Sequence, residues 1–182
     1  MGWSSGWNSR GELARHLVEP QSWTNDNGVN CQTKTLKQCF RGNNLWVIHE
    51  LYKDGVSTSK FIVLYMLKRF GHEGWGYKDV GEECGPTYYN CPLSWFDEVP
   101  DPGSYATEWR ATCRKYYEKL AAVRQNLKTA IKITFNSEIR FSDGVSSMVF
   151  TIERLPRGTC VRRDDGTPVR LSKRLLASGT FE

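Results

Sequence analysis

The stretch Leu45–Leu67 reads LWVIHELYKDGVSTSKFIVLYML and decides the fold of this chain. Its two apolar runs, Leu45–Tyr52 and Lys60–Leu67, are rich in β-branched and aromatic residues and predict two strands. Asp54-Gly55 lies between them and favours the tight turn of a β-hairpin. Because the second run is apolar almost throughout, we expect a central strand that is covered on both faces of its sheet.

The residues before this hairpin predict a short helix, a loop and a further strand. Ser9 and Glu12 have the spacing of a capping box, and the helix is expected over Ser9–Glu19, ending before Pro20. Gln21–Asn30 is polar and is predicted as a turn-rich loop. Thr33–Phe40 tolerates β-structure and is predicted to join the sheet as a strand.

A long amphipathic helix is predicted over Thr107–Lys128. Its apolar residues recur at the 3.6-residue period of a core-facing stripe, which is expected to cover one face of the sheet: Trp109, Cys113, Tyr116, Leu120, Val123 and Leu127. A separate basic stripe lies about 100° away on the helical wheel and consists of Arg110, Arg114, Arg124 and Lys128.

From Ala130 onward the pattern changes to short alternating runs with turns at Asp143-Gly144 and Asp165-Gly166. Five short strands are predicted there, as in a small SH3-like or OB-like antiparallel β-barrel. The predicted class is therefore α+β, with an antiparallel sheet packed by a long helix in residues 1–128 and a small barrel in residues 129–182. A long aromatic and acidic loop is expected within the first domain, over residues 69–106.

The composition excludes several classes of protein. The chain has 182 residues and a net charge of +5, and 39% of its residues are hydrophobic. It is too apolar for a disordered protein, and six cysteines are too few for a disulfide scaffold. The start lacks the pattern of a secretory signal, and the longest apolar run is Phe61–Leu67. We therefore expect a soluble cytoplasmic protein with no membrane contact and with reduced cysteines.

The charges are segregated along the sequence. Residues 154–174 hold seven basic side chains against two acidic ones, and six of the seven are arginines. Guanidinium groups bind phosphate in a bidentate manner, which favours contact with nucleic acid or with an acidic partner. The predicted binding residues are Arg157, Arg162, Arg163, Arg170, Lys173 and Arg174, extended by the helical stripe Arg110, Arg114, Arg124 and Lys128. A solvated helix face remains the alternative interpretation of that stripe.

Residues 69–101 carry the opposite charge, with two basic side chains against seven acidic ones. This segment is also dense in aromatic residues and glycines, and such rings can form a stacking pocket. The candidate pocket residues are Trp75, Tyr77, Lys78, Tyr88 and Tyr89. The alternative is that most of these rings fill an irregular second core.

No metal site and no cofactor are predicted. His72, Cys84, Cys91 and Cys113 lack the Cys-x2-Cys spacing of a zinc knuckle. No Walker loop, nucleophile elbow or dinucleotide fingerprint occurs. An enzymatic alternative would use His72 as a base for Cys91, oriented by Asp79. The non-enzymatic interpretation is favoured because no acid–base pair is fixed by spacing.

Several motifs carry a resemblance: RGNNLWVIHE over residues 41–50, GWGYKD over 74–79, GPTYYNCPL over 85–93, DEVP over 97–100 and IRFSDG over 139–144. Together they resemble an uncharacterised family carried by bacterial plasmids, integrative elements and phages. Small accessory proteins of such elements frequently neutralise host defences such as CRISPR or restriction systems. The resemblance implies an anti-defence protein in the cytoplasm of a bacterial host cell, which binds a host protein or ribonucleoprotein complex through a basic surface. The alternatives are a nucleotide-directed binder or small enzyme with its pocket in Trp75–Cys91, and a DNA-binding regulator.

Overall fold

The computed structural model describes residues 2–156 and 158–182 and shows an α+β protein with two antiparallel sheets. Contacts divide the chain into an N-terminal unit, Met1–Arg114, and a C-terminal unit, Lys115–Glu182. The division falls inside helix α2, Tyr105–Thr129, whereas the sequence suggests a boundary after residue 128. The reason is that the second half of α2 contributes Val123 and Leu127 to the core of the C-terminal unit.

The sheet of the N-terminal unit has six strands in the order β1-β6-β5-β4-β3-β2. These strands are β1 (Ser4–Trp7), β2 (Gln21–Thr24), β3 (Asn30–Arg41), β4 (Asn44–Lys53), β5 (Val56–Phe70) and β6 (Gly74–Gly81). The predicted hairpin is confirmed, because β4 pairs antiparallel with β5 from the Lys53–Val56 pair at the turn to the Asn44–Met66 pair, in the middle of the sheet. Its turn places Asp54 and Gly55 at φ values of 46° and 79°, as an Asp-Gly turn requires.

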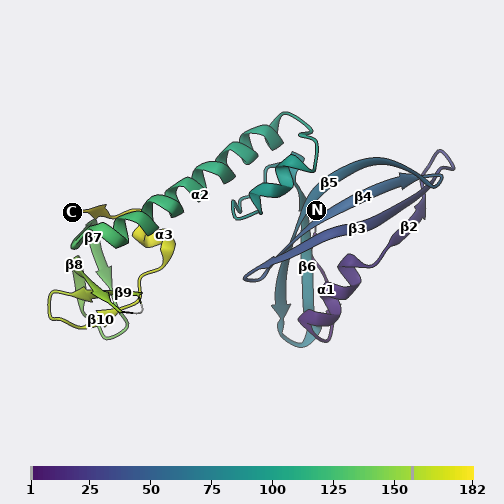
Figure 1. Ribbon diagram of the computed structural model, residues 1–182. Coiled ribbons are helices and arrows are strands. Elements are labelled where there is room, and N and C mark those ends of the chain that lie inside the picture. The colour runs from purple at the N-terminus through teal and green to yellow at the C-terminus, as the bar shows by residue number, and fades with distance from the viewer. Residues whose placement is uncertain (1, 157) are drawn as a thin grey trace. The chain divides into compact units, whose positions relative to one another are not determined.

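Both faces of this sheet are covered, as the apolar β5 sequence predicts. On one face Leu45 and Val47 pack against helix α1, Arg10–Val18, whose Leu13 is fully buried. On the other face Trp46 and its neighbours pack against Trp109, near the start of α2. The sheet is curled like half of a barrel, and α1 lies against it (Figure 1). Residues alternate between the two cores because successive side chains of a strand point to opposite faces.

Helix α1 begins and ends where the sequence predicts. Ser9 is its N-cap, and the Ser9 hydroxyl accepts a hydrogen bond of 3.1 Å from the backbone N–H of Glu12. The loop predicted over residues 21–30 is only partly correct, because Gln21–Thr24 forms β2 and pairs with Asn30–Thr33 of β3. All four β2 residues are exposed, so this edge strand has no apolar alternation in its sequence.

The prediction of one loop over residues 69–106 is wrong in its first part. Strand β6 lies there and pairs with β5 on one side and with β1 on the other. The sequence does not predict this strand, because glycine disfavours β-structure. The structure requires glycine at Gly76, since a Cβ there would lie 2.3 Å from the Ser4 carbonyl oxygen of β1. Three short 3₁₀ helices lie on either side of β6: η1 (Gly71–Glu73) before it, and η2 (Glu82–Cys84) and η3 (Leu93–Asp97) after it.

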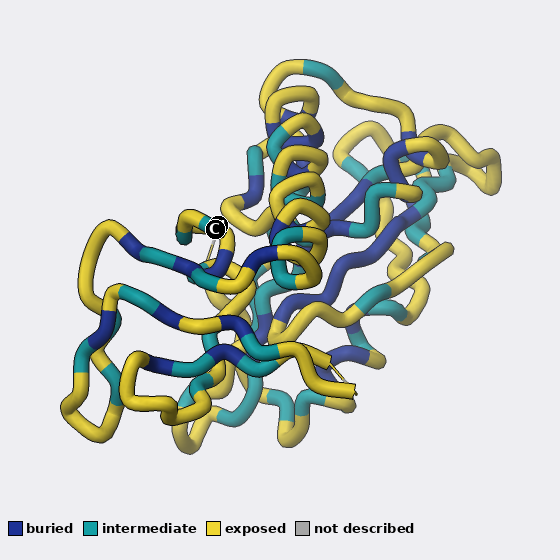
Figure 2. Tube along the Cα trace, turned by 60° about the vertical axis from the view of Figure 1, so that its left-hand side comes forward, coloured by how far each residue is buried: buried dark blue, intermediate teal, exposed yellow. Residues whose placement is uncertain are grey.

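The C-terminal unit is a five-stranded antiparallel sheet in the order β10-β9-β8-β7-β11. Its elements are β7 (Lys132–Arg140), β8 (Ser146–Leu155), β9 (Gly158–Arg163), β10 (Pro168–Val169), α3 (Lys173–Leu176) and β11 (Thr180–Phe181). Burial alternates over the first four residues of β7, where Ile133 and Phe135 join Phe150 in the core. Figure 2 shows buried and exposed residues following one another along the chain. The predicted turns at Asp143-Gly144 and Asp165-Gly166 connect β7 to β8 and β9 to β10.

Candidate functional site

The three residues of the enzymatic alternative are not brought together. His72 lies exposed in η1, before β6 begins, whereas Cys91 lies beyond η2, after β6 has ended. Asp79 is exposed on β6 opposite Tyr65. Cys91 itself is fully buried in the core between the sheet and α2. A base at one end of a strand cannot reach a nucleophile buried past the other end.

The buried cysteines are packing residues. Burial raises the pKa of the Cys91 thiol far above its ordinary value. Burial likewise raises the pKa of Cys113, to about 12. Such thiols stay protonated near neutral pH and are poor nucleophiles and poor metal ligands. Within the described residues, no group of three His, Cys, Asp or Glu side chains could hold a metal ion.

The five candidate pocket residues fall on different parts of the N-terminal unit. Trp75 and Tyr77 pack against the core that contains α1. Tyr88 and Tyr89 are exposed by 42% and 38% in the loop after η2, on the side of the other core. Lys78 follows Tyr77 on β6 and therefore points to the opposite face of the sheet. These side chains do not form one stacking pocket.

Other aromatic residues of the acidic segment do fill a core. Trp95 and Phe96 of η3 are buried beside Trp109. The indole N–H of Trp109 donates to the Tyr88 carbonyl at 2.9 Å, which fixes the irregular loop to α2. This arrangement corresponds to the second-core alternative for these rings.

Arg110 is a buried structural residue and not part of a basic surface. Only 3% of Arg110 is exposed, and its Nε and Nη2 donate to the Glu82 carboxylate at 2.7 and 2.8 Å. Its remaining N–H groups reach the carbonyls of Phe96, Val99 and Pro100. Glu82 is also buried, so the pair ties η2 and η3 to α2. A helical wheel of α2 could not reveal that Arg110 pairs with Glu82, because Glu82 lies 28 residues away in the sequence.

Three arginines of the basic segment 154–174 are held by their own unit, and two of them, Arg162 and Arg163, belong to the predicted surface. Arg163 is 6% exposed and is paired with Asp143 at 2.7 Å and Asp165 at 3.0 Å. Arg162 donates to Glu153 at 2.6 Å and to the Gly166 carbonyl. Arg154 donates to three carbonyls at the end of α2 and thereby caps that helix. Arg157 lies outside the described residues.

The remaining predicted cations are exposed: Arg114 at the end of the N-terminal unit, and Arg124, Lys128, Arg170, Lys173 and Arg174 in the C-terminal unit. The last five, together with Lys115, Lys119 and Arg140, are exposed and have no carboxylate partner among the described residues. We call these eight the unpaired cations. The C-terminal unit holds thirteen Lys and Arg against seven Asp and Glu, a net charge of +6.

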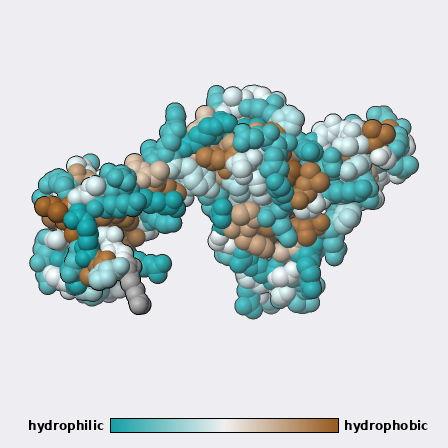
Figure 3. All heavy atoms as spheres, in the orientation of Figure 1, coloured by the Kyte–Doolittle hydropathy of each residue, from teal (hydrophilic) through white to brown (hydrophobic). Residues whose placement is uncertain are grey.

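Two of the unpaired cations meet at a hollow that the sequence does not predict. Lys119 of α2 and Arg174 of α3 line a depression of about 240 Å³, with Tyr116 and Leu120 beneath. Lys119 and Arg174 lie 55 residues apart in the sequence, so no local pattern indicates that they meet. Hydrophilic residues cover much of the visible surface of this unit (Figure 3).

Comparison with known proteins gives one match. Residues 100–174 match a family described as a domain of unknown function, DUF6927, and this stretch covers α2 and β7 to β10. No curated protein and no solved structure matches the chain. No helix in residues 2–156 and 158–182 is long and apolar enough to cross a membrane. The exposed cations of the C-terminal unit are therefore the candidate functional site, because the other predicted residues are buried, paired or far apart.

Proposed function

We propose that this chain is a non-enzymatic accessory protein of a phage or plasmid that inhibits a host defence complex by binding it. The observation that carries the binding step is the set of eight unpaired cations on the C-terminal unit. Exposed cations without internal partners are free to bind phosphates or carboxylates of another molecule. The anti-defence setting rests on the resemblance of the motifs in residues 41–144.

The C-terminal unit supplies a rigid support for these cations. Arg124 and Lys128 project from α2, and Arg170, Lys173 and Arg174 lie in or beside α3. The core of Phe150, Ile133 and Leu176 holds both helices against the sheet. We propose that this sheet is an SH3-like or OB-like module used for docking, with the helices providing the contact face.

A binding assay with a charge-matched control tests the surface. The variant changes Arg124, Arg170, Lys173 and Arg174 to Gln, and the control changes the exposed Arg41, Lys53, Lys60 and Arg69 of the N-terminal unit to Gln. Binding of fluorescein-labelled 20-nucleotide RNA and DNA is followed by fluorescence anisotropy at several salt concentrations. We expect the first variant to bind at least ten-fold more weakly with a shallower salt dependence, since each lost phosphate contact on a single strand removes about 0.7 from the slope of log K against log salt.

Equal weakening in the two variants would show that only net charge matters and would refute a localised surface. If neither nucleic acid binds, affinity capture from host lysate with and without nuclease decides whether the partner is an acidic protein. The anti-defence role predicts that expression of the chain raises phage plating on a defended host and that the first variant loses this effect. Unchanged plating with the intact chain across restriction and CRISPR hosts would remove the role.

A further inference from the structure

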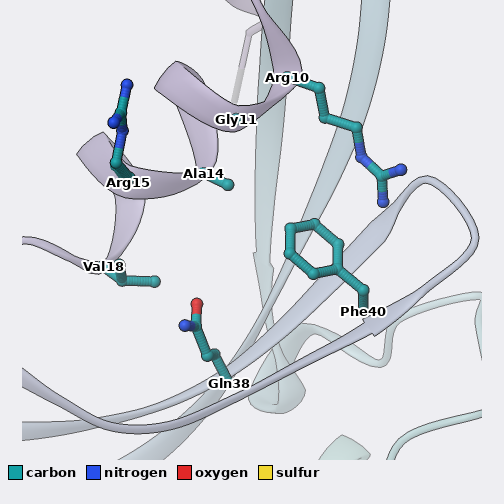
Figure 4. A pocket seen from close by; sticks show the side chains of 7 residues that line it. All are labelled: Arg10, Gly11, Ala14, Arg15, Val18, Gln38 and Phe40. Atoms are coloured by element: carbon teal, nitrogen blue, oxygen red, sulfur yellow. The ribbon is translucent and has the colours of Figure 1, made fainter.

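A hollow of about 560 Å³ lies in the N-terminal unit between α1 and the second half of β3. Figure 4 shows the side chains that line it: the Arg10 guanidinium reaches toward the Phe40 ring, and Val18 and Gln38 point into the space between the helix and the strand. This volume is in the range of sites that hold small molecules. The hollow lies outside the C-terminal unit and is independent of the binding surface proposed above.

A β-bulge creates the floor of this hollow. The register of β3 against β4 shifts between Thr35 and Lys37, so that Gln38 pairs with Val47 and Phe40 pairs with Leu45. Directly paired residues share a face of the sheet, and Leu45 and Val47 face α1. The bulge therefore turns Phe40 to the helix side, where α1 does not cover it and 44% of it stays exposed.

Gly11 has no side chain, and this leaves the hollow open on the side of the helix. A Cβ at Gly11 would meet only the Ser9 hydroxyl oxygen, at 4.0 Å, so neither packing nor backbone conformation requires glycine there. Glycine within a helix costs about 0.5–1 kcal/mol relative to alanine. Since this glycine costs stability and packing does not require it, we infer that it leaves space for a ligand beside the helix.

The charged residues of the hollow are both basic, and neither forms an ion pair with a carboxylate among the described residues. Of the seven residues that line it, two are arginines and none is acidic. Arg10 donates through Nη2 to the Gly42 carbonyl and lies 4.5 Å from the centre of the Phe40 ring. Its Nε is buried and has no hydrogen-bond partner among the described residues. Arg15 is exposed at the rim and has no carboxylate partner in the described part of the chain.

We propose that this hollow binds a small organic anion in which a carboxylate is attached to an aromatic or branched apolar body. Arg10 would bind the carboxylate, because a guanidinium matches it in charge and shape. The Arg15 side chain points away from the hollow in Figure 4 and would contribute only to the positive potential at its rim. Phe40, Ala14 and Val18 would contact the apolar body. The Gln38 amide would orient the ligand through a hydrogen bond.

The test uses three probes with the full-length protein: 2-naphthoate, its neutral analogue 2-naphthamide, and inorganic phosphate. Chemical-shift titration is expected to give saturable binding of 2-naphthoate, with the shifted amides in α1 and β3. We expect 2-naphthamide and phosphate each to bind at least ten-fold more weakly, since each lacks one half of the proposed recognition.

Matched variants locate the binding. Arg10→Gln should weaken 2-naphthoate binding at least five-fold, and Gly11→Leu should abolish it by filling the hollow. Two control variants should keep the affinity of the unmodified chain within two-fold. They are Gly11→Ala and Arg41→Gln, and Arg41 is on the same strand as Phe40 but outside the hollow. If Arg10→Gln does not fold, Gly11→Leu still decides whether 2-naphthoate binds in the hollow.

Three results would overturn the proposal. The first is absence of saturable 2-naphthoate binding. The second is binding of 2-naphthamide or phosphate as tight as that of 2-naphthoate. The third is a folded Gly11→Leu variant that binds 2-naphthoate as well as the unmodified chain does.

Discussion

The N-terminal unit encloses charged and titratable side chains, whereas the C-terminal unit exposes most of its own. His49, Glu82 and Arg110 are buried in the first unit, and Arg163 is the one described buried ionisable side chain in the second. The net charges differ accordingly, at −1 and +6. The comparison shows that an arginine's role depends on its burial and partners. Arg110 holds a loop in place, while Arg124 on the same helix is free to bind another molecule.

The largest expected effect is the loss of the buried pair. Arg110→Leu should lower the free energy of unfolding by about 3–5 kcal/mol, because it leaves the buried Glu82 carboxylate without its partner. Arg114→Leu, one turn along at an exposed position, is the control and should cost less than about 1 kcal/mol. All seven tryptophans lie in the N-terminal unit, so denaturant unfolding followed by tryptophan fluorescence reports on this unit. Equal losses in the two variants would contradict the structural role of Arg110.

The next effect concerns His49, which is buried between Thr35 and Tyr65. Its Nε2 lies 2.9 Å from the Tyr65 hydroxyl oxygen, and burial lowers the pKa of His49 from 6.5 to about 4. The unfolded chain binds a proton in this window and the folded chain does not, so stability is lost as the pH falls from 6.5 toward 4. This lowered pKa corresponds to a loss of about 3 kcal/mol.

Tryptophan-monitored unfolding between pH 7 and pH 4 measures this loss. His49→Gln removes the titrating group while retaining hydrogen-bonding atoms, and its stability should depend less steeply on pH. A slope that is identical in the variant would assign the pH dependence to other groups.

A smaller effect is expected at Arg163, the buried arginine of the C-terminal unit. Its partners Asp143 and Asp165 are about half exposed, so water can replace the guanidinium when it is removed. Arg163→Gln should therefore destabilise its unit by less than Arg110→Leu destabilises the other, as measured by hydrogen exchange in β7 to β9. A larger loss would contradict the difference between the two units.

Arg163→Gln should also change the pKa of Asp143. The backbone N–H of Val145 and the Arg163 guanidinium lower the pKa of Asp143. NMR titration should show that this pKa rises part of the way back in Arg163→Gln, because the Val145 hydrogen bond remains. Arg162→Gln, which loses a partner in Glu153 instead, should leave the pKa of Asp143 unchanged.

The smallest effect is expected for the unpaired cations. Arg170→Gln, Lys173→Gln and Arg174→Gln should each change the free energy of unfolding by no more than about 0.5 kcal/mol, since they make no ion pair within the described residues. Differential scanning calorimetry of each variant measures this. A loss above about 1 kcal/mol would mean that these side chains support the fold, and the proposed surface would lose its free cations.

Local patterns determined a substantial part of this fold. The capping pair Ser9 and Glu12 located α1, and Asp54-Gly55 located the central hairpin. The uninterrupted apolar run of β5 predicted covers on both faces, which α1 and the Trp109 end of α2 supply. These features are readable because turn geometry, helix capping and strand alternation depend on residues that are near each other in sequence.

Only the tertiary structure decided the rest, because the deciding contacts join residues far apart in sequence. Strand β6 pairs with β5, its neighbour in sequence, but its Gly76 is required only because the β1 backbone of Ser4, 72 residues away, comes so close. The apolar stripe of α2 is divided between two cores, with Cys113 in one and Val123 in the other. Arg110 lies in a basic stripe on the helical wheel, yet Glu82 buries its charge. Sequence determined which cations exist, and folding decided which of them remain free, because burial requires a carboxylate that only the tertiary fold can bring near.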